Sequence, residues 1–189
     1  DALERLGVGD VTLLAESFGS QVAWAMIARP REAIRYRRLI LSGGFVQYPW
    51  MGGVHLARGM VTTLGPGGNL LLGSFPLYGR LFYESRPGLA HDLARFVEAR
   101  SRTEDRRAIH HRLGLIAGSD FRSVAAGTRL PVHHLTGVFD PIVPWYPVQR
   151  WLQRHCPGYQ GTVRFHTSDH AVLVSRPTAA ARQISSWMR

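Results

Sequence analysis

The chain contains three residues whose types and order suit nucleophilic catalysis: Ser17, Asp140 and His170. A serine hydroxyl is a poor nucleophile unless it is held clear of the backbone, near a base and beside groups that stabilise an oxyanion. A histidine can supply the base, and a carboxylate can orient the histidine and balance its charge. Each of the three residues follows a short apolar run, so each is expected just beyond the end of a β-strand.

Ser17 is predicted to lie at a sharp turn between a strand and a helix. Residues 11–15 form the apolar run before it, and Gly19 opens an amphipathic stretch that continues to Ile27. Such a turn exposes the serine side chain and places backbone N–H groups of the helix start beside it. We therefore expect the N–H of Phe18 to face the oxyanion. The alternative role for Ser17 is that of a turn serine that caps the helix.

Asp140 and His170 are predicted to lie in the loops after two further strands. These strands are expected over residues 130–137 and 162–167. The alternative for Asp140 is a simple Asp-Pro turn. Its competitor for the acid role is Asp120, which is expected to cap a short helix before the strand at 130–137.

The segment Ala15–Gly19 resembles the nucleophile elbow of the α/β-hydrolase fold, whose usual form is G-x-S-x-G. Ala15 replaces the first glycine, and alanine is small enough for the close contact between strand and helix. The order serine, acid, histidine is also the order of the catalytic triad in this fold. The runs that contain Asp140 and His170 look like the acid and histidine loops of the same family.

The resemblance implies a serine hydrolase of the carboxylesterase or lipase type, which acts on an ester or a related acyl compound. In this mechanism Ser17 attacks the carbonyl, and His170 removes the serine proton. Asp140 orients the imidazole, and the Phe18 N–H stabilises the oxyanion until water releases the acyl group. No cofactor and no metal are implied, and the expected partner is a small acyl substrate. The serine separates the chain from the haloalkane dehalogenase and epoxide hydrolase branches, which use an aspartate nucleophile.

The other candidate side chains are expected to be structural. Glu16 adjoins the serine, but the turn should direct it away from the base. Asp169 is expected to form a turn beside the histidine. His133 and His134 should face opposite sides of one strand, so at most one of them can approach a site. The H-E-x-x-H pattern of zinc sites is absent from the sequence.

The alternation of short apolar runs with helical stretches predicts an α/β fold with a parallel sheet of about four strands and flanking helices. Residues 1–44 should carry the nucleophile elbow and a strand that begins at residue 38. Residues 128–189 should carry the acid and histidine loops, with a helix over 145–155 between them. Residues 45–127 interrupt the alternation with an insertion that is helical over 89–99 and 103–116. This insertion resembles the helical cap of many α/β-hydrolases, which roofs the site and shapes the acyl pocket.

The beginning of the sequence predicts that the N-terminal strands of the full fold precede it. Residues 1–7 have the pattern of the last turns of a helix, and the nucleophile strand follows at once. We therefore expect the C-terminal portion of a longer hydrolase, in which the preceding part supplies the second oxyanion N–H. The open edge of the strand at 11–15 predicts self-association, and this chain alone is expected to be weakly active or inactive.

The composition argues against several other classes of protein. No run of 18 or more apolar residues suits a membrane span. The sequence shows no signal-peptide pattern, but its true N-terminus is expected to lie outside it, so cytoplasmic is the default localisation. The formal charge of +10 comes with 23 scattered arginines and no nucleic-acid motif, so no nucleic acid is expected as a partner. Cys156 is the one cysteine and has no internal disulfide partner.

Two other functions stay open at this point. The chain could be a non-catalytic remnant of an α/β-hydrolase that serves as a binding or interaction module through its cap. It could also be a peripheral membrane binder that uses the apolar stretch Leu70–Leu77.

Overall fold

The computed structural model describes residues 2–63 and 103–189. The chain forms two compact units, one made of Asp1–Pro49 with Ser119–Arg189 and the other of Trp50–Gly118. The predicted helix over 89–99 and the stretch Leu70–Leu77 lie outside the described residues. The elements of the first unit are α1 (Ala2–Arg5), β1 (Asp10–Glu16), α2 (Gly19–Ala28), β2 (Arg35–Ser42), α7 (Arg122–Gly127), β3 (Val132–Gly137), α8 (Trp145–His155), β4 (Tyr159–Phe165), α9 (Val172–Ser175) and α10 (Pro177–Met188).

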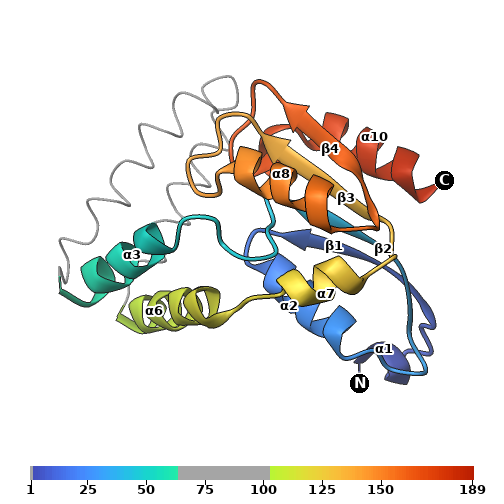
Figure 1. The fold of residues 1–189 in the computed structure, drawn as a ribbon, viewed down its shortest axis with the longest axis horizontal. Coiled ribbons are helices and arrows are strands. Elements are labelled where there is room, and N and C mark those ends of the chain that lie inside the picture. Colours follow the sequence, from blue (N-terminus) through green and yellow to red (C-terminus); the bar gives the residue numbers. More distant parts are fainter. Residues whose placement is uncertain (1, 64–102) are drawn as a thin grey trace. The chain divides into compact units, whose positions relative to one another are not determined.

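The first unit is built on one sheet of four parallel strands in the order β1-β2-β3-β4 (Figure 1). The register pairs Glu16 with Ser42, and Ser42 with Leu135, so the carboxyl ends of three neighbouring strands lie at one edge. The prediction of a four-stranded parallel sheet with flanking helices is confirmed. In a sheet of this kind, loops at the carboxyl ends of the strands are the usual place for a site.

β2 forms the centre of the core because both of its faces are covered. Leu39, Ile40 and Leu41 are consecutive and completely buried, as expected for a parallel strand that is covered on both sides. Figure 1 shows α2, α7 and α8 on one side of the sheet and α10 on the other. Trp24 of α2 and Leu152 of α8 are also completely buried. Burial of one such leucine contributes roughly 1.5–3 kcal/mol to stability.

α10 covers its face of the sheet over β3 and β4. Pro177 stands at the start of α10, where its missing N–H removes no helix hydrogen bond. Leu135 of β3 packs with Ala180 of α10 in a buried cluster. On the same face, the His133 ring stacks on Trp187 with 4.6 Å between the ring centroids.

β2 and β4 begin three residues earlier than the apolar pattern predicts. The predicted starts are residues 38 and 162, whereas the strands begin at Arg35 and Tyr159. Arg35 and Arg37 donate hydrogen bonds of 2.9–3.0 Å to the carboxylate of Asp10 on β1. Charged residues extend β2 through these ion pairs, and a pattern of apolar residues cannot reveal such an extension.

The second unit contains two described helices, α3 (Met51–Thr63) and α6 (Thr103–Gly118), which pack against each other. The sequence predicts α6 over 103–116 but predicts no helix at α3, whose second and third residues are glycines. The Trp50 ring packs over the first turn of α3, and a Cβ at Gly53 would lie 2.5 Å from Trp50 Cε3. The predicted insertion at 45–127 encloses this unit, and its role as a cap stays a prediction.

β1 is an edge strand of the described sheet. Within residues 2–63 and 103–189 it pairs with β2 alone, and its Leu14 side chain is 48% exposed. An uncovered edge of this kind favours pairing with another chain. Self-association through β1 stays a prediction.

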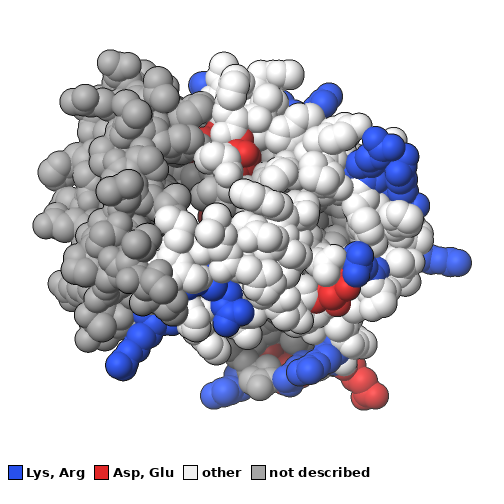
Figure 2. Space-filling view, turned by 60° about the vertical axis from the view of Figure 1, so that its left-hand side comes forward, with Lys and Arg blue, Asp and Glu red and all other residues white. Residues whose placement is uncertain are grey.

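The positive charge of the described surface is spread out. Figure 2 shows arginine side chains at several separate places on the visible face. Some of these charges are paired, for example Arg31 with Glu4 at 3.4 Å and Arg122 with Asp120 at 2.6 Å.

The helices in the described ranges do not combine the length and the apolar character that a membrane crossing requires.

His134 is a buried histidine on the face of β3 opposite to His133. It is 0% exposed, and its Nδ1 lies 3.0 Å from Thr162 Oγ1 on β4. Its Nε2 has no hydrogen-bond partner among the described residues. Burial lowers the pKa of His134 to about 4, although the negative charge of Asp140 raises it. The side chain is therefore neutral at pH 7, as expected for a structural histidine.

The buried His134 predicts that the protein loses stability in mild acid. Below pH 6.5 the unfolded chain takes up a proton at this residue, whereas the folded chain does so only near pH 4. The free energy of unfolding should therefore fall between pH 6.5 and pH 4, by about 3 kcal/mol in total. Urea unfolding at pH 7.0, 5.5 and 4.5 measures this loss. His134→Asn should flatten the pH dependence, and the exposed control His166→Gln should keep it. Equal slopes for His134→Asn and the unchanged protein would contradict this assignment.

Candidate active site

The three residues with a predicted catalytic role follow the carboxyl ends of three strands. Ser17 follows β1 directly, Asp140 lies three residues beyond β3, and His170 lies five residues beyond β4. Because the strands are parallel, these ends share one edge of the sheet. Residues that are far apart in the sequence are thereby brought into one region.

Ser17 occupies a strained turn. Its φ is +51°, and among the described residues it alone combines a positive φ with a side chain. Such a conformation costs on the order of 1–3 kcal/mol and persists only where the surroundings hold it. The Ser17 N–H donates to Ser42 O at 2.9 Å, and Ser17 O accepts the N–H of Ser20 at 3.0 Å and its hydroxyl at 2.7 Å. The predicted sharp turn is confirmed, with α2 beginning at Gly19.

Two polar side chains of α2 join this turn to the loop after β2. The Ser20 hydroxyl accepts the N–H of Phe45 at 3.1 Å, and Gln21 Nε2 donates to Phe45 O at 3.0 Å. Ser20 and Gln21 are 0% and 4% exposed, so these hydrogen bonds do not compete with water. The sequence pattern did not indicate a role for Ser20 and Gln21. The only signal is two adjacent polar residues in a helix that is otherwise mostly apolar.

Asp140 and His170 are in direct contact. His170 Nδ1 lies 2.7 Å from Asp140 Oδ2, and the side chains are 14% and 0% exposed, respectively. The second carboxylate oxygen, Oδ1, accepts the N–H groups of Ile142 and Val143 at 2.8 Å each. A carboxylate can only accept hydrogen bonds, so Nδ1 carries the proton of the neutral imidazole. His170 Nε2 is then the basic nitrogen.

The backbone of Ser42 and Gly43 connects the serine with the histidine. Ser42 O accepts the Ser17 N–H, and Gly43 has φ +54° and packs against the His170 ring. A Cβ at Gly43 would lie 3.1 Å from both Cε1 and Nδ1 of His170. No hydrogen bond joins Ser17 Oγ to His170 in the described structure. Catalytic hydrogen bonds are often long when no substrate is bound.

Phe18 and Glu16 flank the serine. Phe18 is the N-cap residue of α2, with φ −55° and ψ −28°. Its N–H therefore stands at a helix N-terminus, which favours negative charge. The pKa of Glu16 is raised, mainly because the side chain is partly buried. The charge of His170 lowers this pKa and the charge of Asp169 raises it, but both effects are smaller than that of burial. Glu16 is thus within electrostatic reach of His170, and that the turn directs its side chain away from the base stays a prediction.

The competing acid, Asp120, is engaged elsewhere in the first unit. Asp120 accepts the backbone N–H of Arg122, the first residue of α7, at 3.0 Å, but the N-cap position that was predicted for it is occupied by Phe121. Asp120 also accepts guanidinium hydrogen bonds of 2.6–3.0 Å from the same arginine. The hydrogen bonds from Arg122 lower the pKa of Asp120. Asp140 is therefore the acid that contacts His170.

The described residues offer no donor set for a metal. Within them, no three His, Cys, Asp or Glu side chains are grouped so that they could hold an ion. Cys156 is a buried free thiol, and burial raises its pKa. Asp169 Oδ1 accepts the N–H of Ala171 at 3.2 Å and so forms the predicted turn.

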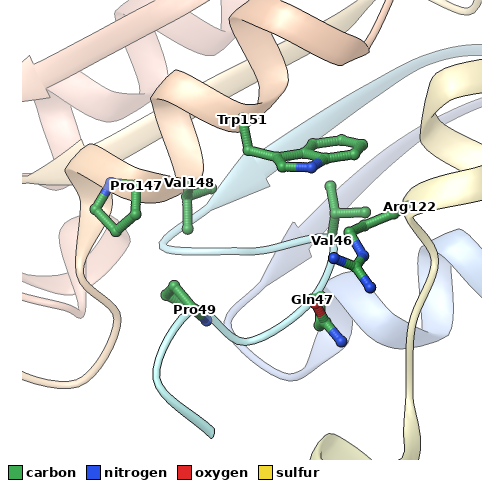
Figure 3. A pocket seen from close by; sticks show the side chains of 7 residues that line it. All are labelled: Val46, Gln47, Pro49, Arg122, Pro147, Val148 and Trp151. Carbon is green, nitrogen blue, oxygen red and sulfur yellow. The ribbon is translucent and has the colours of Figure 1, made fainter.

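A small recess lies between the loop after β2, the start of α7 and the first half of α8 (Figure 3). Its volume is about 150 Å³. Figure 3 shows the indole of Trp151 above Val46, with the Arg122 side chain entering from α7. The lining is mostly apolar and consists of Val46, Gln47, Pro49, Arg122, Pro147, Val148 and Trp151. Ser17 and His170 do not line this recess, so it is not the site of the predicted chemistry.

The structure resembles solved α/β-hydrolases, although no family model and no curated protein matches the sequence. The chain aligns with an α/β hydrolase enzyme from a Medee basin deep-sea metagenome library with a TM-score of 0.79 at 15% identity. This alignment covers 99% of the present chain and 68% of the other.

Two further solved structures are similar to this chain over nearly its whole length. A thermophilic esterase from Thermogutta terrifontis aligns with a TM-score of 0.74 at 19% identity, over 100% of this chain and 68% of that chain. The enol-lactonase from Burkholderia xenovorans LB400 aligns with a TM-score of 0.69 at 20% identity, over 99% and 68% of the two chains. At these identities the likeness shows the fold alone. The chain has the α/β-hydrolase fold, as the elbow at Ser17 predicts.

The close contact between Gly43 and His170 predicts that a methyl group at residue 43 displaces the imidazole. Gly43→Ala adds a Cβ 3.1 Å from the ring and places alanine at φ +54°. We expect the reaction of Ser17 with a fluorophosphonate probe to slow by about 10- to 100-fold. The matched control is Gly127→Ala, since a Cβ at the end of α7 meets no atom within 4 Å. An unchanged labelling rate in Gly43→Ala would show that the ring position does not depend on Gly43.

Proposed function

We propose that this chain is a serine hydrolase that acts on an ester or a related acyl compound. Ser17 is the nucleophile, His170 the general base and Asp140 the residue that orients the base. The Phe18 N–H is one donor to the oxyanion. The single observation that carries the proposal is the 2.7 Å contact between His170 and Asp140 at the sheet edge where Ser17 forms its strained turn.

The reaction follows from the orientation of the His170 ring, whose Nδ1 lies on Asp140. His170 Nε2 removes the Ser17 proton as Oγ attacks the substrate carbonyl, and Asp140 balances the charge of the imidazolium. The negative charge on the carbonyl oxygen develops beside the N-terminus of α2, where the Phe18 N–H stabilises it. As this intermediate collapses, the bond from the carbonyl carbon to the alcohol oxygen breaks, and His170 gives its proton to the leaving alcohol, so the acyl group stays on Ser17. A water molecule, deprotonated by His170, then attacks the acyl carbon, the bond to Ser17 Oγ breaks with return of the proton to Oγ, and the acid leaves.

The substrate class rests on the residues at the site and on the similar structures. A serine nucleophile with a histidine base suits acyl transfer, and the solved structures of this fold include esterases and an enol-lactonase. We assign the second unit, Trp50–Gly118, the role of the cap that shapes the acyl pocket. A small neutral ester is therefore the first substrate to test.

A second candidate function is a non-catalytic interaction module with the same fold. The observation in its favour is that no hydrogen bond joins Ser17 Oγ to His170 in the described structure. Under this alternative the contact between Asp140 and His170 only stabilises the sheet edge. The two functions differ in whether Ser17 reacts with an acyl or phosphonyl electrophile.

Covalent labelling of Ser17 separates the two functions. We expect a fluorophosphonate to modify the protein once, at Ser17, as peptide mass spectrometry will show. Ser17→Ala should abolish both labelling and ester turnover because no other group replaces the nucleophile. The control is Ser186→Ala, which removes an exposed hydroxyl that bonds within α10. A chain that is not labelled while its circular dichroism shows a folded protein would favour the interaction module.

The orienting role of Asp140 predicts a large effect of an isosteric change. Asp140→Asn keeps the shape of the side chain but favours the wrong imidazole tautomer, so turnover should fall by about 10⁴-fold. Asp120→Asn is the matched control because it removes a carboxylate that binds Arg122 rather than His170. Steady-state hydrolysis of a chromogenic ester measures both variants. Comparable losses in the two variants would mean that Asp140 has no special role.

A further inference from the structure

The peptide group between Ile142 and Val143 has a hydrogen bond at each end. Its N–H, that of Val143, donates to Asp140 Oδ1 at 2.8 Å. Its carbonyl oxygen, Ile142 O, accepts a hydrogen bond from the hydroxyl of Tyr48. A hydrogen bond to the carbonyl polarises a peptide and strengthens its N–H as a donor. The Tyr48 hydroxyl therefore acts on the carboxylate of Asp140 through one peptide group.

The ring of Tyr48 is held in place by Phe45, which is bound to the helix that follows Ser17. It packs edge-on against Phe45, with 5.3 Å between the ring centroids and an interplanar angle of 86°. Phe45 is 1% exposed, and its N–H and carbonyl bind Ser20 and Gln21 of α2. The Tyr48 hydroxyl thus contacts the loop of Asp140, while the Tyr48 ring packs on Phe45, which is hydrogen-bonded to α2.

The protonation state of Tyr48 suits this role. Burial raises the pKa of Tyr48, and the negative charge of Asp140 raises it further. The hydroxyl consequently keeps its proton at neutral pH and can donate it to Ile142 O.

We propose that Tyr48 is a positioning residue for Asp140, which keeps the Ile142–Val143 peptide aimed at Oδ1 so that Oδ2 stays on His170 Nδ1. The catalytic consequence rests on the proposed hydrolase function, whereas the effect on the Asp140–His170 contact does not. Tyr48 touches neither substrate nor the reacting atoms in this scheme. Its effect on the reaction passes through Asp140 and then through the imidazole.

The test is the full chain with Tyr48→Phe, which keeps the ring and its contact with Phe45 but removes the hydroxyl. Proton NMR should show the Nδ1–H of His170 far downfield in the unchanged protein, as is typical of an imidazole bound to a carboxylate. In Tyr48→Phe this signal should move upfield and exchange faster with water. His170→Gln identifies the signal. The matched control is Tyr146→Phe, which removes an exposed hydroxyl that binds Arg150.

Hydrolysis kinetics give a second readout. In Tyr48→Phe, kcat should fall by about 2- to 10-fold with little change in KM, because a modest hydrogen bond is lost away from the substrate. The melting temperatures of the two tyrosine variants should agree.

An Nδ1–H signal with the same position and exchange rate in Tyr48→Phe as in the control would overturn the proposal. Absence of the signal from the unchanged protein would overturn it as well. If no variant hydrolyses esters and Ser17 is not labelled, the proposed function fails, and the NMR comparison still decides the role of Tyr48.

Discussion

The turn at Ser17 keeps its φ of +51° only because its backbone N–H and carbonyl are both held. The N–H binds Ser42 O at the end of β2, and the carbonyl binds Ser20 in the first turn of α2. These partners come from two different elements, so the serine cannot relax without moving the sheet edge or the helix. A strained conformation of this kind persists where the surrounding structure over-determines it. The conformation of Ser17 is therefore a property of β1, β2 and α2 together.

The loop after β2 extends the same constraint to the histidine and the acid. Gly43 lies against the His170 ring, Phe45 is bound to α2, and the Tyr48 hydroxyl is bound to Ile142 O of the acid loop. The serine and the Asp140–His170 pair are thus held in place by one short segment, although no hydrogen bond joins Ser17 Oγ to the imidazole in the described structure. We expect this segment to tolerate few changes, because its contacts hold the His170 ring, α2 and the loop of Asp140.

The sequence alone determined the features that depend on local pattern. An apolar run, a serine and a glycine that opens a helix predicted the turn at Ser17, because each part requires only its neighbours in the chain. The same holds for α8, which begins and ends where its pattern predicts, and for the four parallel strands as a set. Asp140 and His170 could be named because each follows a recognisable strand. Their 2.7 Å contact follows once parallel strands bring the loops to one edge.

Only the tertiary structure decided which residues hold these groups in place. Nothing in the sequence distinguishes Ser20 and Gln21 from other helix residues, because their partner Phe45 lies beside them only in the folded chain. In the same way, only the contact with the His170 ring distinguishes Gly43 from other glycines at strand ends. The link from Tyr48 to Ile142 joins positions 94 residues apart, which no local pattern records. Strand starts at charged residues, such as Arg35, and the helix α3 were also missed. Apart from the start of α3, where Trp50 is a neighbour in the chain, the decisive partner is distant in sequence, so a local pattern cannot reveal it.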